Sequence, residues 1–186
     1  YTSREMTAYY VRVLEDDVPL ALDVISDIVL NSVFDAKELE IERGVILQEI
    51  GQSLDTPDDI IFDWLQDKAY PNQAMGRAIL GSTENVRSFS REDLQNFVNE
   101  HYGPEQMVLS AAGSVDHDAL VEEAQILFGG LRRTPKLLNE ASKFIGGEVR
   151  VVKDLEQAHF ALSFESASYL DDKIYTAQIY ATALGG

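Results

Sequence analysis

Two glutamates, Glu42 and Glu49, are the first candidates for chemistry in this sequence, because they stand seven residues apart among apolar residues at helical spacing. Seven residues span nearly two helical turns, so we expect both carboxylates on one face. Val45 and Ile46 lie between them, and an acid beside an apolar stripe is poorly solvated. Such an acid favours a cation or a metal ion as its partner, although glutamates on amphipathic helices more often simply face solvent.

A second pair of acids, Asp59 and Asp63, follows at i and i+4 on the next expected helix. Thr56 as N-cap and Pro57 at the first helical position mark the start of that helix. Two carboxylates one turn apart repel each other by about 0.2–0.5 kcal/mol on an exposed helix. A guanidinium between them would relieve the repulsion and donate bidentate hydrogen bonds. The alternative is that Asp59 only stabilises the helix N-terminus, which explains Asp63 less well because it lies beyond the first turn.

The stretch ERGVILQEI at residues 42–50, followed by DTPDDIIFDWL at 55–65, resembles the insulinase and mitochondrial processing peptidase family of zinc endopeptidases. In that family an H-x-x-E-H helix provides two histidine ligands and the general base, and a glutamate on a later helix is the third ligand. The resemblance, which extends through nearly the whole chain, implies that Glu49 is this zinc ligand. It also implies that Glu42, seven residues earlier, supports the catalytic site without being a ligand.

The same resemblance implies substrate-binding roles for two further pairs of residues. In mitochondrial processing peptidases, two acids at the places of Asp59 and Asp63 hold arginines of the targeting peptide. Tyr1 and Thr2 match the remnant of an edge strand to which the peptide backbone adds as a further strand. The Asn-Ala pair that precedes this strand in the family is absent here, and a plain outer strand is the alternative.

The histidines limit what the chain can do alone. Only His101, His117 and His159 are present, no two of them at i and i+4, and we interpret all three as structural. A catalytic zinc site needs three protein ligands and a water, and a chain without cysteine must supply them from histidine and carboxylate. We therefore expect that this chain alone neither binds zinc tightly nor cleaves peptides, and that the H-x-x-E-H helix lies upstream of Tyr1.

The charge of the chain restricts its partners. With 15 basic and 32 acidic side chains the formal net charge is −17, which argues against nucleic acid and anionic membrane surfaces. Basic peptides would suit this charge, and a soluble acidic protein without any charged partner explains it equally well. No apolar run reaches the roughly 18 residues of a transmembrane helix, so we expect no membrane insertion and a bacterial-type cytoplasmic location.

The elements that must position these residues are expected to be strands and helices in one layered domain. Apolar patterns predict strands at 1–14, 107–112, 148–152 and 159–165, and helices at 18–33, 36–54, 57–69, 90–101, 118–128 and 172–184. Asp35 is the expected N-cap of the second helix, and Ser90 with Asp93 forms an expected capping box. We expect an α+β fold, an α/β sandwich with a mainly antiparallel sheet and helices on one face, as in processing peptidases.

A basic break that contains glycine and proline divides the chain. We interpret residues 1–130 as the C-terminal part of a first, zinc-site domain, 131–142 as a linker, and 143–186 as the beginning of a second, non-catalytic domain of similar fold. The expected helix of that second part carries no H-x-x-E-H, as the resemblance implies. We expect both ends of the chain to be cut inside a larger protein.

The predicted function is therefore that of a fragment of a zinc-dependent metalloendopeptidase of the processing-peptidase type. Its substrates would be peptides bound as an added edge strand, arginine-bearing ones among them, and its partner a related subunit in a homo- or heterodimer. Two alternatives stay open. One is a non-catalytic relative that acts as a partner subunit or as a structural subunit of a respiratory complex, and the other is an unrelated acidic binding module. An upstream H-x-x-E-H would favour the enzyme.

Overall fold

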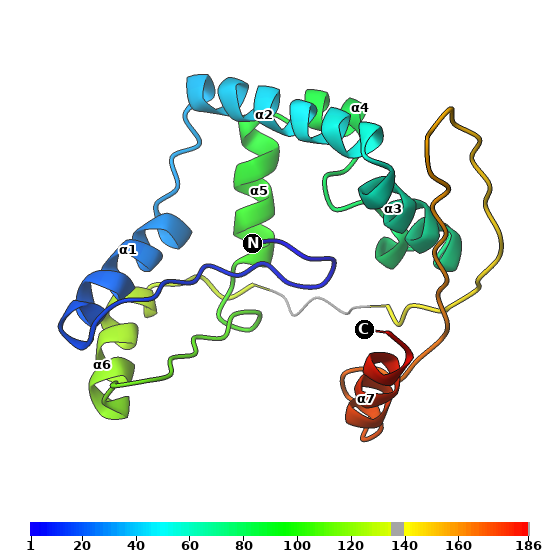
Figure 1. Ribbon diagram of the computed structural model, residues 1–186. Coiled ribbons are helices and arrows are strands. Elements are labelled where there is room, and N and C mark those ends of the chain that lie inside the picture. The colour runs from blue at the N-terminus through cyan, green and yellow to red at the C-terminus, as the bar shows by residue number, and fades with distance from the viewer. Residues whose placement is uncertain (135–139, 186) are drawn as a thin grey trace. The chain divides into compact units, whose positions relative to one another are not determined.

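The computed structural model describes residues 1–134 and 140–185, which divide into two compact units. Unit 1 contains Tyr1–Gln52 and Ile79–Ala141, and unit 2 contains Ser53–Ala78 and Ser142–Gly186, in each case without the undescribed positions. Figure 1 shows the chain as a series of helices joined by irregular segments. The expected linker at 131–142 lies partly outside the described residues.

The regular structure of the described residues is helical. In chain order the helices are η1 (Glu15–Asp17), α1 (Val18–Leu30), α2 (Ala36–Asp55), α3 (Pro57–Ala69), η2 (Ala74–Gly76), α4 (Thr83–Ser88), α5 (Arg91–His101), α6 (His117–Phe128) and α7 (Ile174–Gly185). The helices predicted at 36–54, 57–69 and 90–101 are confirmed to within one residue at each end. Helix α4 was not predicted; Ser82 begins it by accepting a hydrogen bond from the Asn85 N–H.

The predicted sheet does not occur in the part of the chain that the structure describes, so the prediction of an α+β fold with a mainly antiparallel sheet is wrong. Residues 8–14, 107–112, 148–152 and 159–165 are neither strand nor helix, and one isolated antiparallel bridge joins Thr2 to Thr7. Alternating apolar residues favour an extended backbone, but a strand also needs a neighbour to pair its N–H and C=O groups. Without such neighbours the side chains of these segments stay in solvent: Val108 is 92% exposed and Val152 is 97% exposed.

Unit 1 contains the contact of α1 with α6 and the capped start of α5. Leu22, Ser26 and Val29 recur at helical spacing and are the buried residues of α1. At the start of α5, the Asp93 carboxylate accepts from the Ser90 N–H at 2.8 Å while the Ser90 hydroxyl oxygen accepts from the Asp93 N–H, which confirms the predicted capping box. Hydrogen bonds from the Ser90 side chain and then its backbone lower the pKa of Asp93.

Aromatic side chains meet at the C-terminal end of α5. The hydroxyl oxygens of Tyr9 and Tyr102 lie 3.1 Å apart, and the rings of Phe97 and Tyr102 meet edge to face with centroids 6.3 Å apart. Burial raises the pKa of Tyr102 to about 12, and the hydrogen bond with Tyr9 acts in the same direction. These contacts attach the N-terminal segment of the chain to α5.

The backbone just after α5 passes very close to Thr134. The Thr134 hydroxyl is buried and donates to the Gln106 side-chain oxygen at 2.6 Å. A Cβ placed on Gly103 would overlap the Thr134 hydroxyl oxygen. With the Thr134 side chain in this place, glycine is the residue that position 103 accommodates without a clash.

Unit 2 contains α3 and a later extended segment, residues 143–165, which we call the strap. The Lys153 ammonium group donates to the Leu54 carbonyl at 2.8 Å and lies 5.8 Å from the centroid of the Trp64 ring. The first contact is with the C-terminal end of α2 and the second is with α3, next to which the strap runs in Figure 1. Because these contacts are exposed, they are individually weak.

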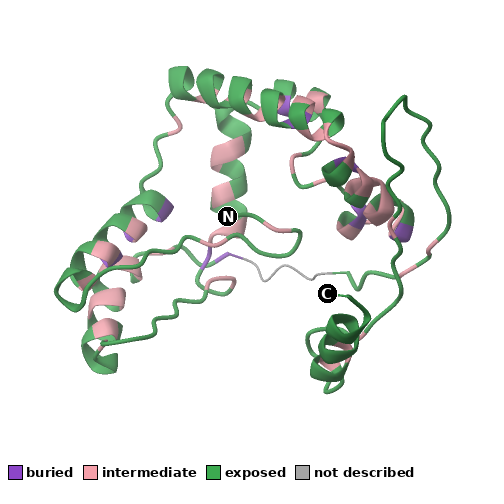
Figure 2. Ribbon diagram, viewed as in Figure 1, coloured by how far each residue is buried: buried purple, intermediate pink, exposed green. Residues whose placement is uncertain are grey.

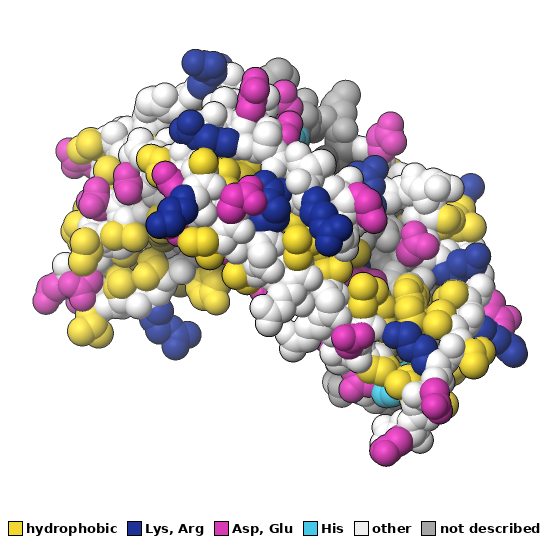
Figure 3. All heavy atoms as spheres, turned by 90° about the horizontal axis from the view of Figure 1, so that it is seen from above, with side chains coloured by type: hydrophobic (Ala, Val, Ile, Leu, Met, Phe, Trp, Pro, Cys, Tyr) yellow, Lys and Arg dark blue, Asp and Glu magenta, His cyan; other side chains and the backbone are white. Residues whose placement is uncertain are grey.

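Few of the described residues are buried, as Figure 2 shows in purple. The buried apolar residues are Leu22, Val29, Ile50 and Val86 in unit 1 and Ile60 and Ala69 in unit 2. Figure 3 shows hydrophobic side chains at the surface among charged ones. None of the helices within residues 1–134 and 140–185 combines the length and the apolar content that crossing a bilayer requires.

Candidate functional site

The two glutamates predicted to form a site lie on α2, in unit 1. Glu42 and Glu49 are both exposed, whereas Ile50 beside Glu49 is buried. At 3.6 residues per turn, positions seven apart differ by only about 20° around the helix axis. Both carboxylates therefore share one solvent-facing side of a continuous helix.

The start of α2 is fixed from two directions. An Asp35 carboxylate oxygen accepts from the Lys37 N–H at 2.9 Å and from the Glu38 N–H at 3.2 Å, which confirms Asp35 as the N-cap. Just before it, Arg91 of α5 donates from Nε and Nη2 to the Val33 carbonyl at 3.2 and 2.9 Å. The connector into α2 is thereby tied to the first residue of α5.

Arg43, which the sequence pattern did not single out, leaves the acidic face of α2 and reaches α4. Its Nη1 donates to the Val86 carbonyl, and its Nη2 donates to the Phe89 carbonyl at 2.7 Å. The guanidinium also meets Glu40 of its own helix, with Nε and Nη2 at 3.2 and 3.1 Å from one carboxylate oxygen. The Arg43 side chain is 19% exposed, against 69% for Glu40. The two carbonyls that Arg43 meets lie 43 and 46 residues away in the sequence, so these contacts could not be predicted from sequence spacing.

The two aspartates of the second pair lie on α3, in unit 2. Asp59 is exposed in the first turn, and Asp63 is half-buried one turn later. Thr56 is the N-cap residue as predicted, although no hydrogen bond from its side chain caps the helix. The neighbouring Asp58, which was not singled out, lies 2.7 Å from Nδ1 of His159 in the strap. This contact is in keeping with a structural role for that histidine.

Tyr1 and Thr2 lie in a short turn of the chain back on itself. The Ala8 N–H donates to the Tyr1 carbonyl at 2.9 Å, next to the antiparallel bridge of Thr2 with Thr7. On the other side of this bridge the Ser3 N–H donates to the Met6 carbonyl at 2.7 Å. Because these hydrogen bonds lie on either side of the Thr2–Thr7 pair, the N–H and C=O of Thr2 point outward. The outward side of Thr2 is the side to which a further extended peptide could bond.

The described residues contain no group of three or more His, Cys, Asp or Glu side chains that could hold a metal ion. Glu49 offers one carboxylate of the kind that zinc accepts, and Glu42 offers another on the same face. The donor set of a catalytic zinc site is therefore not complete within residues 1–134 and 140–185.

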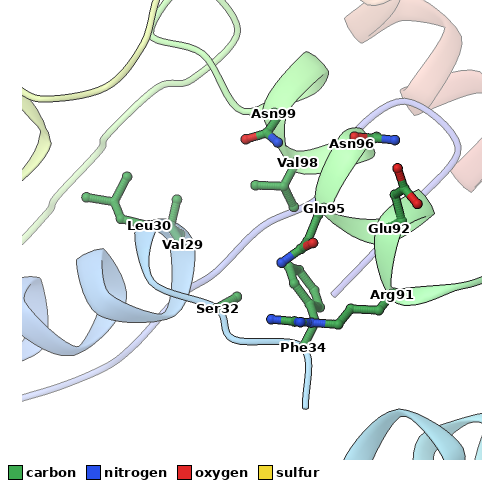
Figure 4. A pocket seen from close by; sticks show the side chains of 10 residues that line it. All are labelled: Val29, Leu30, Ser32, Phe34, Arg91, Glu92, Gln95, Asn96, Val98 and Asn99. Atoms are coloured by element: carbon green, nitrogen blue, oxygen red, sulfur yellow. The ribbon is translucent and has the colours of Figure 1, made fainter. Parts of the chain in front are cut away.

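A pocket of about 610 Å³ in unit 1 includes none of the predicted site residues. It lies between the end of α1, the connector to α2 and α5, and Figure 4 shows side chains from these elements around the space. Phe34 in the connector has a φ of 47°, which is uncommon for a bulky residue. This pocket could not be predicted from the sequence, because Gln95 and Asn96 are ordinary polar residues of a helix surface and Ser32 is an ordinary residue of a connector.

Two family models match the chain in succession. The model described as insulinase (peptidase family M16) matches residues 1–83, and the model described as peptidase M16 inactive domain matches residues 88–186. Together they cover both the acidic helices and the segments that follow.

Curated relatives align with the whole of this chain. An uncharacterized zinc protease of Rickettsia felis is 40% identical over 187 residues, which is 100% of this chain and 45% of the relative. A probable mitochondrial-processing peptidase subunit beta of Arabidopsis thaliana is 41% identical over 191 residues, 100% of this chain and 36% of that protein. The human mitochondrial-processing peptidase subunit beta is 39% identical over 189 residues, 100% of this chain and 39% of that subunit. The chain thus spans less than half the length of these relatives.

Solved structures resemble the chain in fold. A chain of complex III2 from Candida albicans, solved with Inz-5 bound, has a TM-score of 0.61 at 21% identity and covers 74% of this chain and 33% of its own. A putative M16-like peptidase from Alicyclobacillus acidocaldarius has a TM-score of 0.56 at 25% identity and covers 69% of this chain and 29% of its own. The two family matches, which together extend over nearly the whole chain, show that it belongs to the insulinase family, peptidase family M16.

Proposed function

We propose that this chain is part of a zinc-dependent metalloendopeptidase of the processing-peptidase type, in which Glu49 is a zinc ligand and Glu42 supports the site. The observation that carries the proposal is the exposed face of α2 on which both carboxylates lie. That face belongs to a chain that is 40% identical along its whole length to a protein named as a zinc protease.

Glu49 suits zinc as far as one residue can. Its carboxylate is exposed, so a metal ion can reach it, while the buried Ile50 next to it holds this part of the helix in place. A carboxylate oxygen is one of the ligands that zinc accepts. When bound, zinc supplies a Lewis acid and lowers the pKa of a bound water towards about 7. Glu49 would offset part of the ion's charge, and Glu42 would accept a hydrogen bond from another ligand and so orient it. The remaining ligands and the general base would come from an H-x-x-E-H helix outside the described residues.

The proposed substrates are peptides, with arginine-bearing peptides favoured. Asp59 and Asp63 would accept hydrogen bonds from an arginine side chain, and the outward N–H and C=O of Thr2, beside Tyr1, would pair with the peptide backbone. The net charge of −17 supports a basic substrate over an acidic one.

We further propose that the intact protein works with a related subunit, as a homo- or heterodimer in the bacterial-type cytoplasm. Two relatives come from Rickettsia species, and others are named as subunits of mitochondrial-processing peptidase. The division into 1–130, a linker at 131–142 and a second domain from 143 remains a prediction. A non-catalytic subunit is the second candidate function, because several relatives are named as subunits of a larger peptidase.

The proposal is tested in the full-length protein by Glu49→Gln, which keeps the shape of the side chain and removes its charge. Bound zinc per chain and turnover of a fluorogenic peptide should both fall severely while the far-ultraviolet circular dichroism is retained. Glu42→Gln should be milder, with losses of roughly 10- to 100-fold, the range for residues that orient a ligand.

Glu38→Gln is the matched control, because Glu38 is an exposed acid one turn before Glu42 on the same helix. It should change neither zinc content nor turnover. If Glu49→Gln retains full zinc and near-normal turnover, Glu49 is a solvent-facing acid and the proposed enzymatic role loses its residue-level support. An intact protein without H-x-x-E-H and without turnover would favour the non-catalytic subunit.

A further inference from the structure

Arg43 connects α2 to the end of α4 through two backbone carbonyls. The carbonyls of Val86 and Phe89 belong to the last turn and the C-cap of α4, where a helix runs out of its own N–H donors. Phe89 closes the helix with its own N–H, which donates to the Asn85 carbonyl at 3.1 Å. Arg43 adds two donors at this end from another helix.

The geometry of the guanidinium makes this contact directional. Its N–H groups lie in one plane at fixed angles, so two of them can meet two carbonyls only in a narrow range of orientations. Glu40 holds the same guanidinium from its own helix, and the Arg43 side chain is 19% exposed, so water competes little for these bonds. A lysine ammonium would keep the charge and lose this orientation.

Arg43 does not share the acidic face of α2. It lies about 100° around the helix axis from Glu42 and about 120° from Glu49, at 3.6 residues per turn. Any influence on those carboxylates must therefore pass through the backbone of α2. The two hydrogen bonds from the Arg43 guanidinium to the α4 carbonyls, which we call the Arg43 fork, restrain the rotation and the sideways position of this helix.

We propose that Arg43 is a positioning residue, which fixes the orientation of α2 and so the direction in which the Glu49 carboxylate meets its metal. The inference rests on the proposed function, because it takes Glu49 to be a zinc ligand. Arg43 itself touches neither metal nor substrate. Its loss acts on zinc affinity and on the geometry of the metal site more than on the fold.

The experiment compares Arg43→Lys and Arg43→Ala in the full-length protein. Zinc affinity is measured by competition with a chelator, the site geometry by the visible absorption bands of the Co²⁺-substituted protein, and the fold by the thermal midpoint of circular dichroism. Arg43→Lys should lower zinc affinity by roughly 10- to 100-fold, the range for groups that orient a ligand. It should also shift the Co²⁺ bands, lower kcat with little change in KM, and leave the thermal midpoint near that of the wild type.

Arg87→Lys is the matched control, since it makes the same chemical change at an exposed arginine in the last turn of α4. It should leave zinc affinity and the Co²⁺ bands unchanged. The inference is overturned if Arg43→Lys keeps wild-type zinc affinity and Co²⁺ bands. It is also overturned if both Arg43 variants lose zinc only in step with their thermal midpoints, because the role is then purely structural.

The two proposals fail separately. If Glu49→Gln loses zinc and Arg43→Lys keeps it, the positioning role is overturned and the proposed function stands. Glu49→Gln that keeps its zinc overturns the proposed function and the positioning role with it.

Discussion

Helices α2 and α3 each carry a pair of acids, but different kinds of contact hold them. On α2, the Arg43 fork meets two carbonyls at the end of another helix and is mostly shielded from water. On α3, Asp58 and Trp64 each meet one side chain of the strap: His159 Nδ1 lies 2.7 Å from the Asp58 carboxylate, and the Lys153 ammonium lies 5.8 Å from the centroid of the Trp64 ring. A planar fork fixes orientation, whereas one ammonium over a ring leaves room for adjustment. The comparison suits a rigid helix for a ligand to an ion and a more adjustable one for acids that meet variable peptides.

The largest effect that would separate the role of the α3 acids from that of the α2 acids is expected from Asp59→Asn combined with Asp63→Asn in the full-length protein. Hydrogen bonds to charged groups are worth about 1.5–3 kcal/mol, so kcat/KM for arginine-bearing peptides should fall about 10- to 100-fold. Peptides without arginine should be cleaved normally, and zinc content should not change, in contrast to Glu49→Gln.

Asp67→Asn is the control for the aspartate pair, since Asp67 is an exposed acid one turn beyond Asp63 on the same helix. It should affect neither peptide class. An equal loss on peptides with and without arginine would indicate a folding defect and refute a specificity role for α3.

A smaller effect is expected from Lys153→Ala, which removes the strap's cation from the Leu54 carbonyl and the Trp64 ring. The free energy of unfolding should fall by about 1 kcal/mol, because exposed cation–π contacts and single hydrogen bonds contribute about that much. Arg150→Ala is the control on the same strap, because its ion pair with Glu148 is highly exposed and should contribute almost nothing. Denaturation by urea gives both values. If Lys153→Ala alters zinc affinity as strongly as Arg43→Lys does, the contrast between the two helices is wrong.

The smallest expected effect concerns pH and the start of α5, whose Arg91 ties down the connector into α2. The pKa of Asp93 is lowered in the folded protein by hydrogen bonds from Ser90. The stabilisation is therefore complete above the ordinary carboxyl pKa of about 3.9 and is lost as the pH falls through the lower, folded value. Urea unfolding at neutral and at acidic pH should show a smaller loss on acidification in Asp93→Asn than in the wild type. Equal losses would mean that the capping carboxylate does not contribute to the pH dependence.

Local chemistry explains which elements were predictable. Asp35 and Ser90 cap α2 and α5 through contacts with N–H groups only two or three residues away, so the sequence alone indicates these starts. Asp116 caps α6 in the same way, although it was not predicted as a cap. Strands depend on partners elsewhere in the chain, and the alternation of Tyr9, Val11 and Val13 carries no information about whether such a partner is present.

The candidate site divides in the same way. The shared face of Glu42 and Glu49 follows from helical periodicity and was predictable. The contacts of Arg43 with the α4 carbonyls, and of His159 with Asp58, join residues distant in sequence and could not be read from spacing. Periodicity places a residue on a face, and only the packed chain decides what that face meets.

The close approach of Gly103 to the Thr134 hydroxyl couples two distant positions of the sequence. A methyl group at position 103 would need the space that the threonine oxygen occupies, while Thr134 is held in place by its hydrogen bond to Gln106. Substitution at either position therefore changes what the other tolerates: an alanine at 103 would need a smaller residue at 134 and a shift of the Gln106 side-chain oxygen, which would lie 2.9 Å from the added Cβ. Sequence drift at the exit of α5 is thus constrained in pairs, not one residue at a time.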